Sequence, residues 1–479
     1  MAIIIKRSLL AASVAVAITA PMTVLATNGM NLEGYGPIAT GMGGASMAYD
    51  NGTAGIMNNP ATLGLMDEGT SRLDVALGQL APDISNDGGP FGTAESGGDS
   101  YFMPAVGYTK RDGQLTYGVG MFAQGGMGTE YEANTFMAAG TGEAVRSEVG
   151  VGRLVAPIAY NIDKNLTIGG SIDYVWGGMD LKMAMGGTQF ADFIAPLGGT
   201  QSAGTASGTM VDGLVAAFGT VITGMNSVRF DFSNDSDYTG EATGAGITGK
   251  IGLTYKVNNN LTVGATYHAK TAMDDLETNN ATVSMAVTAD VGWATTGTPS
   301  GTFADMTLPL TGKLSVNDFQ FPAQIGVGMA YTQDKWMFAA DVKVIQWADV
   351  MDSFRMSFTA DAIPSNGGFG GAAFDVEMYQ NWEDQTVVQL GGAYKLSSAT
   401  SLRAGLNSSS NPVPDAYVNP MFPATIENHY TLGVGHALDK TSGIDFSLTI
   451  APEVSVTGGS GVTTTHAQTN WQFMYSNKF

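Results

Sequence analysis

The 479-residue chain contains no cysteine and few cationic side chains. The lack of cysteine excludes a disulfide framework and any metal site built from thiolates. Lysine and arginine total 21 against 43 aspartate and glutamate residues, a net charge of −22. Nucleic-acid binding needs clustered cations to neutralise phosphates, so no nucleic-acid partner is expected. After residue 26 the sequence also lacks an apolar run of about 20 residues, the length that a transmembrane helix needs.

The first 26 residues have the layout of a secretory signal peptide. Lys6 and Arg7 precede an apolar stretch over residues 9–20, and residues 24–26 (Val-Leu-Ala) fit a cleavage site. A core helix or a membrane anchor is the alternative, but the flanking residues favour a signal over residues 1–26. We therefore expect the mature chain to leave the cytoplasm.

Strict alternation of apolar and polar residues recurs along the rest of the chain and predicts β-strands. The segments 166–176, 261–270, 336–344, 402–407 and 444–450 all show it. Their apolar face includes Leu166, Ile168, Ile172, Trp336, Phe338 and Val342. In a soluble sandwich this face would form the core, whereas in an outer-membrane barrel it would contact lipid.

The lengths of the connections favour the barrel. Short polar turns are expected at 110–114, 161–165, 258–260, 332–335, 397–400 and 439–442. Between them lie long connections, roughly 81–100, 123–144, 187–225, 273–315, 359–383, 408–425 and 455–466. Alternating short and long connections are typical of outer-membrane barrels, with tight periplasmic turns and long outer loops. The sequence thus predicts an all-β, antiparallel transmembrane barrel of about fourteen strands over residues 71–479.

Aromatic residues mark the expected membrane boundary. Six of them lie beside the short turns and would form a girdle at the periplasmic interface: Tyr108, Tyr160, Tyr255, Tyr331, Trp336 and Tyr394. Trp471, Phe473, Tyr475 and Phe479 alternate in the last segment, as in the final strand of an outer-membrane barrel. A coincidental edge strand is the alternative.

Residues 27–70 do not alternate and are rich in glycine and alanine around Asn59-Pro60-Ala61. Wide barrels are often plugged by folded segments of this kind. We therefore predict that residues 27–70 form a plug in the lumen.

Several ordered motifs resemble the FadL/TodX family of outer-membrane transporters for hydrophobic compounds. The N-terminal ones resemble the family's hatch: Gly41-Met42-Gly43-Gly44-Ala45, Ala48-Tyr49-Asp50 and Asn59-Pro60-Ala61. Others resemble its strands: Gly118-Val119-Gly120 with Gly128-Thr129-Glu130-Tyr131, Phe321-Pro322-Ala323-Gln324, and Leu402-Arg403-Ala404-Gly405 with Asn411-Pro412-Val413-Pro414-Asp415. No clear match covers 187–245 or 281–313.

The resemblance implies uptake of long-chain fatty acids or aromatic hydrocarbons across the outer membrane. Capture in an outer-loop groove would precede passage to a lumen pocket, and release would follow a hatch shift or a lateral exit at a kink in the third strand. Gly118, Gly120, Gly125 and Gly126 could form such a kink, because glycine weakens and bends strands. Ordinary strand-end glycines are the alternative.

An apolar pattern at helical spacing runs from Val211 to Met225 and predicts an amphipathic helix in an outer loop. We expect an apolar capture groove or, alternatively, a helix packed over the barrel mouth. The candidate capture residues are Phe190, Phe193, Leu214, Phe218 and Ile222.

Polar residues on the predicted lumen face offer candidate partners for a ligand carboxylate. The cations are Lys270, Lys343 and Arg403, and mutual ion pairing with residues such as Asp341 and Asp445 is the alternative. His268 is expected to be a polar lining residue. Residues 234–237 (Asn-Asp-Ser-Asp) could bind calcium, but a solvated acidic loop is the favoured interpretation.

No catalytic motif is present: the chain lacks a G-x-S-x-G elbow, an H-E-x-x-H pair and a cysteine nucleophile. We therefore predict a monomeric, non-enzymatic transporter without cofactor or metal, whose partners are a hydrophobic small molecule and outer-membrane lipid. A general diffusion porin is the first rival, and a barrel enzyme is the second.

Overall fold

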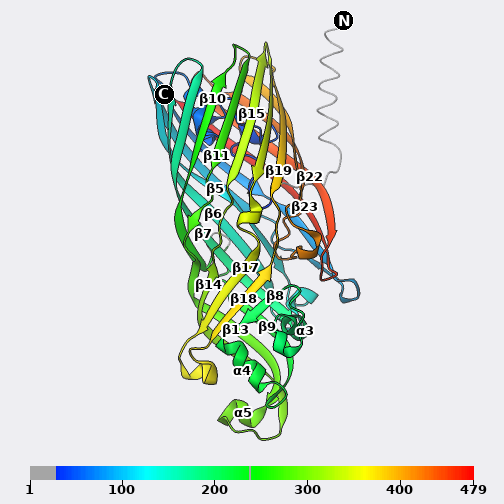
Figure 1. Cartoon of the computed structure of the whole chain (residues 1–479). Helices are drawn as coiled ribbons and strands as arrows, with labels where there is room; N and C mark the ends of the chain where they lie inside the picture. Colours follow the sequence, from blue (N-terminus) through cyan, green and yellow to red (C-terminus); the bar gives the residue numbers. More distant parts are fainter. Residues whose placement is uncertain (1–27, 237–238) are drawn as a thin grey trace.

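The computed structural model describes residues 28–236 and 239–479. The expected signal peptide at residues 1–26 lies outside the described residues. The described strands form a single antiparallel sheet that closes on itself (Figure 1). Because β1 pairs with β23 from Arg72↔Lys478 to Gln79↔Trp471, the sheet closes into a barrel.

The closed circuit follows the pairing β1-β4-β5-β6-β7-β10-β11-β15-β16-β19-β20-β21-β22-β23 and back to β1. Its strands are β1 (Ser71–Leu80), β4 (Tyr101–Asp112), β5 (Leu115–Tyr131), β6 (Val145–Asn161), β7 (Leu166–Gly186), β10 (Ala242–Lys256), β11 (Leu261–His268), β15 (Gln324–Gln333), β16 (Trp336–Ile345), β19 (Gln385–Lys395), β20 (Thr400–Ser409), β21 (Asn428–Ala437), β22 (Ser442–Thr457) and β23 (Thr463–Lys478).

Further strands prolong the sheet at one end. They are β2 (Pro82–Asp87), β3 (Thr93–Glu95), β8 (Gly204–Ser207), β9 (Ile222–Phe232), β12 (Ala272–Met273), β13 (Leu276–Asp290), β14 (Phe303–Asn317), β17 (Ser353–Ala360) and β18 (Ala373–Tyr379). Six of them pair in the run β7-β9-β13-β14-β17-β18-β8. Of the others, β2 pairs with β23 and β3, and β12 pairs with β10. The closed circuit has fourteen strands, but with the strands that prolong it the sheet has 23 among the described residues, so the prediction of about fourteen leaves out the extensions. Segments 187–225, 273–315 and 359–383, expected as loops, contain several of them.

The structure also contains short helices. The α-helices are α2 (Pro37–Thr40), α3 (Gly187–Asp192), α4 (Thr209–Ala217) and α5 (Val291–Thr296). The 3-10 helices are η1 (Gly52–Ile56), η2 (Pro60–Leu65), η3 (Gly89–Phe91), η4 (Phe136–Ala138), η5 (Ala195–Leu197), η6 (Trp347–Asp349), η7 (Pro364–Phe369) and η8 (Asp415–Tyr417). Within the described part of the chain, none of the helices has the length and apolar content needed to cross a membrane.

The two faces of the circuit strands differ as alternation predicts. Ile168, Ile172, Phe338 and Val342 are exposed on the outside, and Ile172 keeps 75% of its surface. Inward neighbours such as Asp173 are fully buried. The six predicted short turns connect consecutive circuit strands at the end opposite α3, α4 and α5 (Figure 1). An apolar outer wall around a buried polar interior fits a barrel in lipid rather than a sandwich core.

Residues 28–66 precede β1 and are enclosed by the circuit strands, in blue near the end that carries the short turns (Figure 1). Asp341 in β16 accepts hydrogen bonds from the backbone N–H groups of Ser46 (2.6 Å) and Met47 (3.1 Å). Gly43, with a φ of 70°, donates its N–H to Thr431 in β21 (2.9 Å) and packs on the backbone of β20, where a side chain would collide. This segment thus contacts the wall strands on several sides.

Candidate functional site

The barrel wall is interrupted between β4 and β5. Their ladder runs from Asp112↔Leu115 to Ala105↔Phe122 and stops there, although both strands continue. Beyond this point Tyr101–Pro104 pair only with β1, and β5 from Ala123 onward pairs only with β6. Pro104 has no N–H to donate to a ladder. The result is a gap in a wall that is otherwise hydrogen-bonded.

A one-residue bulge in β5 widens this gap. The β5–β6 register shifts between Ala123 and Gly125, which leaves Gln124 as the extra residue. Such a bulge bends its strand and re-aims its side chains. The bulge adjoins Gly125 and Gly126, whereas Gly118 and Gly120 belong to the regular part of the strand.

A cavity of about 500 Å³ occupies the gap. It is bounded by β4 on one side and β5, β6 and β7 on the other, and its wall combines exposed side chains such as Phe102 and Met121 with buried ones such as Phe122. The space therefore extends from the outer face of the barrel into the wall. Its size is within the usual range for small-molecule sites, and its lining is mostly apolar or glycine: Leu80, Ile84, Met103, Met127, Val149 and Val151 are further members.

Residues of the N-terminal segment hold the bulge from the inside. Asn31 forms a bridge with Gly125, and the Tyr35 hydroxyl donates to the backbone oxygen of Gln124 (2.8 Å). The Gln124 side chain accepts from Arg153 Nε and donates to Asn31 Oδ1 (3.3 Å). The shape of the gap thus depends on the position of residues 31–35.

Buried charges lie below the gap, where two cations share one carboxylate. Asp173 accepts from Arg153 Nη1 (3.0 Å) and from the Lys250 ammonium group, and all three are buried. The Ser171 hydroxyl also donates to Asp173 (2.6 Å). The mutual ion pairing expected as an alternative to ligand binding therefore accounts for Lys250.

The three predicted ligand cations are dispersed. Arg403 pairs with Asp445 (2.7 Å), and Lys343 lines a separate polar pocket beside His268 and Asn58. Lys270 lies past the end of β11 and is exposed, so its expected position in the lumen is wrong. His268 Nε2 contacts the Asn58 carbonyl oxygen (3.0 Å), as a polar lining residue would.

The motif Asn59-Pro60-Ala61 begins η2 and fixes the N-terminal segment to the wall. Asn59 Oδ1 accepts from Ala61 N (3.1 Å), and its Nδ2 donates to Met47 O (2.8 Å) and to Leu253 O in β10 (3.2 Å). Proline at the first position of the helix is favoured because its missing N–H would have no partner there.

Glu33, also in the N-terminal segment, is fully enclosed. Burial raises the pKa of the Glu33 carboxyl to about 7, although a hydrogen bond from the Thr449 hydroxyl (2.7 Å) opposes the shift. Desolvation disfavours the charged carboxylate, which explains the direction.

The predicted capture residues lie in the apolar core of the outer end. Phe190, Phe193, Leu214 and Ile222 are buried, and Phe218 packs against the same cluster. The predicted helix is shorter than expected: α4 ends at Ala217, and Ile222 begins β9. These side chains therefore cover the barrel mouth, which was the alternative reading, and do not line an open groove as they stand.

A small cavity of about 20 Å³ lies in this core. It is lined by Met30, Phe319, Phe354, Trp382 and Phe422, among others, and shares Val149 with the larger cavity. The way inward from the outer end is therefore apolar but closely packed, and a ligand has to displace side chains there.

Sequence reasoning missed the residues that shape the gap: Gln124, Asn31, Arg153, Asp173 and Glu148. Nothing in their local pattern distinguishes them from other polar positions. The only available signal was Pro104 facing the glycine-rich part of the next strand. The possible calcium site at 234–237 includes Asp237, which lies outside the described residues; among the residues that the structure describes, no group of three acidic or histidine side chains could hold a metal.

Comparison with known proteins gives consistent results. Residues 13–478 match the family model described as outer membrane protein transport protein (OMPP1/FadL/TodX). The toluene transporter TodX of Pseudomonas putida is 29% identical, with a TM-score of 0.77 over 93% of this chain and 99% of that one. The Ralstonia pickettii toluene transporter TbuX is also 29% identical, with a TM-score of 0.73 over 94% and 99%.

A curated relative, an uncharacterized protein of Chlorobium limicola encoded in the 5′ region of the phosphoenolpyruvate carboxykinase gene, is 47% identical over 85 residues. The match covers 18% of this chain and 42% of that protein, so the chain spans less than half of its length. With a family match over nearly the whole sequence and solved relatives of the same fold, the chain belongs to the OMPP1/FadL/TodX family of outer membrane transport proteins.

Proposed function

We propose that this protein carries hydrophobic small molecules, such as monoaromatic hydrocarbons, across the outer membrane and releases them sideways through the gap between β4 and β5. The main support for this proposal is the cavity of about 500 Å³ that reaches from the outer face of the barrel into its wall. An apolar molecule in such a passage never needs to enter water. The sequence similarity to two toluene transporters supports the choice of ligand.

The outer end would act as the collecting surface. Its core contains many large apolar side chains, and burying one such side chain against a ligand is worth about 1.5–3 kcal/mol. Because Phe190, Phe193, Leu214 and Ile222 are buried, capture requires that the partly buried Phe218 and its neighbours move apart. The small cavity at Val149 would be the next step inward.

Residues 28–66 would act as the hatch that keeps the lumen closed to water-soluble solutes. Their contacts with Asp341, Thr431 and Leu253 support this role, as does their burial. A general diffusion porin would need an open lumen, which is the reason to prefer a hydrophobic channel. We also infer cleavage of residues 1–26 and a monomeric state.

Gly150 offers a direct test of the passage. It lines the cavity, and a Cβ added there would meet no described heavy atom within 4 Å. Gly150→Phe should therefore fill the space without disturbing the strand. We expect protein-dependent uptake of radiolabelled toluene by cells that produce this variant to fall about tenfold or more, because packed atoms exclude a ligand of similar size.

Gly150→Ala is the matched control and should retain most of the uptake. Heat-modifiable migration in gels would report folding of both variants. Normal uptake by a folded Gly150→Phe protein would show that the ligand takes another route.

A further inference from the structure

One ionised side chain borders the proposed passage. Of the lysine, arginine, aspartate and glutamate residues that the structure describes, Glu148 alone lines the large cavity. The other lining residues are apolar, glycine or uncharged polar groups, together with His466. Glu148 lies on β6 at the outer end of the cavity, beside the turn that contains Thr239 and Gly240.

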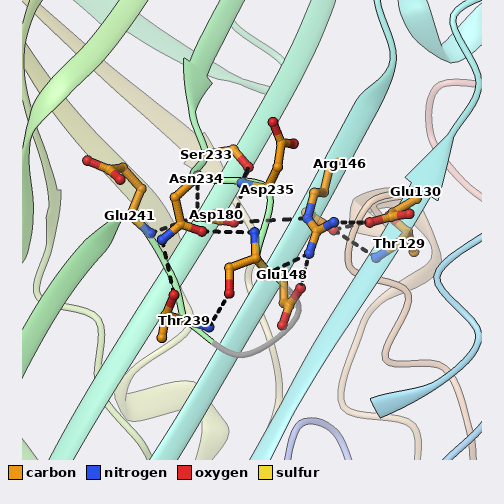
Figure 2. Close-up of polar contacts among 12 residues, drawn as sticks. Thr129, Glu130, Arg146, Glu148, Asp180, Ser233, Asn234, Asp235, Thr239 and Glu241 are labelled. Atoms are coloured by element: carbon orange, nitrogen blue, oxygen red, sulfur yellow. Dashed lines mark hydrogen bonds and ion pairs between the residues drawn. The ribbon is translucent and has the colours of Figure 1, made fainter.

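The nearest cation is shared among several carboxylates (Figure 2). Arg146 donates to Glu130 and, through Nη2, to Glu148 (2.5 Å), and its Nε lies 4.0 Å from Asp180. The same guanidinium donates to the Ser236 carbonyl oxygen (3.0 Å). One positive charge therefore faces three negative ones, and it is directed at them rather than at the cavity.

Asp180 fixes this acidic group at the cavity. Its carboxylate accepts from the backbone N–H groups of Glu241 (2.6 Å) and Asn234 (3.3 Å) and from the Ser233 hydroxyl (3.1 Å) (Figure 2). These bonds hold the turn against β7, where Gly240 packs on Gly178. The acidic side chains at this edge of the cavity are therefore held by defined hydrogen bonds.

Cations elsewhere in the interior are already engaged or lie outside the passage. Arg153 and Lys250 share the Asp173 carboxylate below the gap, and neither cation lines the large cavity. Arg403 pairs with Asp445, and Lys343 lines the separate polar pocket. The small cavity at Val149 has no charged side chain in its described lining, and its polar groups are Gln380, Asn419 and the indole N–H of Trp382. A carboxylate on this route would lose its hydration without gaining a cationic partner.

We propose that the passage accepts uncharged apolar molecules and rejects carboxylates, with Glu148 as the residue that determines this specificity. This inference rests on the proposed function and narrows its ligand class. Two effects act in the same direction: an ionised ligand is costly to desolvate in an apolar cavity, and the Glu148 carboxylate repels it at the rim. A neutral hydrocarbon or alcohol is subject to neither effect.

A pair of ligands that differ only in charge tests the proposal. Cells lacking their own copy of the protein, with and without the wild-type chain, are given radiolabelled 1-dodecanol or dodecanoate at pH 8, and toluene in parallel. We expect protein-dependent uptake of dodecanol to exceed that of dodecanoate by about tenfold or more, as expected for unfavourable charge interactions at low dielectric. Equal uptake of the two by the wild-type protein would overturn the proposal, whatever the variants do.

Glu148→Gln should raise dodecanoate uptake several-fold and leave dodecanol uptake nearly unchanged. Asp235→Asn is the matched control: it removes an anion from the same region, but Asp235 pairs with Lys182 and does not line the cavity. A selective gain for the anionic ligand distinguishes a specificity role from a structural one, because a loosened rim would change the uptake of both ligands. An unchanged ratio in a folded Glu148→Gln protein would refute the role of Glu148. Absence of uptake of toluene and dodecanol alike would instead refute the proposed function.

Discussion

The two ends of the barrel interior are built from opposite kinds of side chain. At the end with the short turns, the lumen contains paired charges and the hydrogen-bonded N-terminal segment, with Asp173, Asp341 and Asn59 at its centres. At the outer end, the interior is an apolar cluster around Phe190, Phe230 and Phe374. Polar networks fix one geometry because each unpaired group would be costly, whereas apolar contacts can be rearranged at small cost. The polar end is suited to closing the lumen and the apolar end to admitting a ligand.

Removal of the polar N-terminal segment should have the largest effect on the difference between the two ends. If residues 28–66 are the proposed hatch, their deletion should turn a barrel with little conductance into one that passes small hydrophilic ions, because these buried residues would no longer block the lumen. Conductance in planar bilayers would measure the effect. If the deleted protein folds and its conductance equals that of the wild type, the segment is not the barrier.

Within the polar end, Asp173→Ala should have the next largest effect. The substitution leaves Arg153 and Lys250 buried without their shared carboxylate, and breaking a buried pair in this way costs about 3–5 kcal/mol. The temperature at which the folded form disappears in heat-modifiable gels should fall accordingly. Asp352→Asn, in an exposed pair with Arg355, is the control and should change stability by less than about 1 kcal/mol. Similar losses in the two variants would contradict the distinction.

A core substitution at the apolar end should destabilise only that end. Leu214→Ala removes a side chain that is 1% exposed and should cost about 2–5 kcal/mol in the packing of the outer end. Because the circuit strands do not depend on it, we expect faster proteolysis near α3 and α4 with an unchanged barrel in gels. Val215→Ala, which alters a half-buried neighbour, should be milder. Loss of the whole barrel in Leu214→Ala would mean that the two ends fold as one unit.

The smallest expected effect depends on pH. The pKa of Glu33 is raised by burial to about 7, so between its unfolded value and 7 the folded protein binds this proton more tightly than the unfolded chain. Stability from this group is therefore highest below about pH 4.5 and declines until pH 7. Glu33→Gln should remove that decline and stabilise the protein at pH 8 by about 1–3 kcal/mol.

Thermal unfolding at pH 5 and pH 8 would check the prediction for Glu33. The advantage of Glu33→Gln over the wild type should be larger at pH 8. An advantage that grows as the pH falls would have the wrong sign and would contradict the assignment.

Alternation was sufficient to predict the barrel, because each inward or outward position can be read from neighbours two residues apart. Ile172 and Phe338 are exposed and Asp173 is buried as that rule requires. The same rule failed for β13 and β14, whose many threonines and glycine-rich flanks resembled loops, although both strands continue the wall beyond the membrane.

The site depended on contacts between distant residues and was accordingly less predictable. Gln124 is an ordinary position in sequence, and it becomes the bulge because Asn31 and Tyr35 meet it from another part of the chain. Lys270 would face inward if β11 continued, but the strand ends at His268. Glu148 gained its importance only when the break in the β4–β5 ladder placed a cavity beside it.

The enclosure of residues 28–66 also restricts the order of events during folding. This segment is bound by strands that are synthesised last: Gly43 meets Thr431 across 388 residues, and Glu33 meets Thr449 across 416. Contacts of such sequence separation form slowly, because long loops must close first. A segment enclosed on all sides cannot easily enter a barrel that has already closed. The last strands must therefore fold around residues 28–66 as β23 pairs with β1. Closure of the barrel and enclosure of the N-terminal segment are therefore a single step. No stage of assembly needs to expose an open pore to the cell.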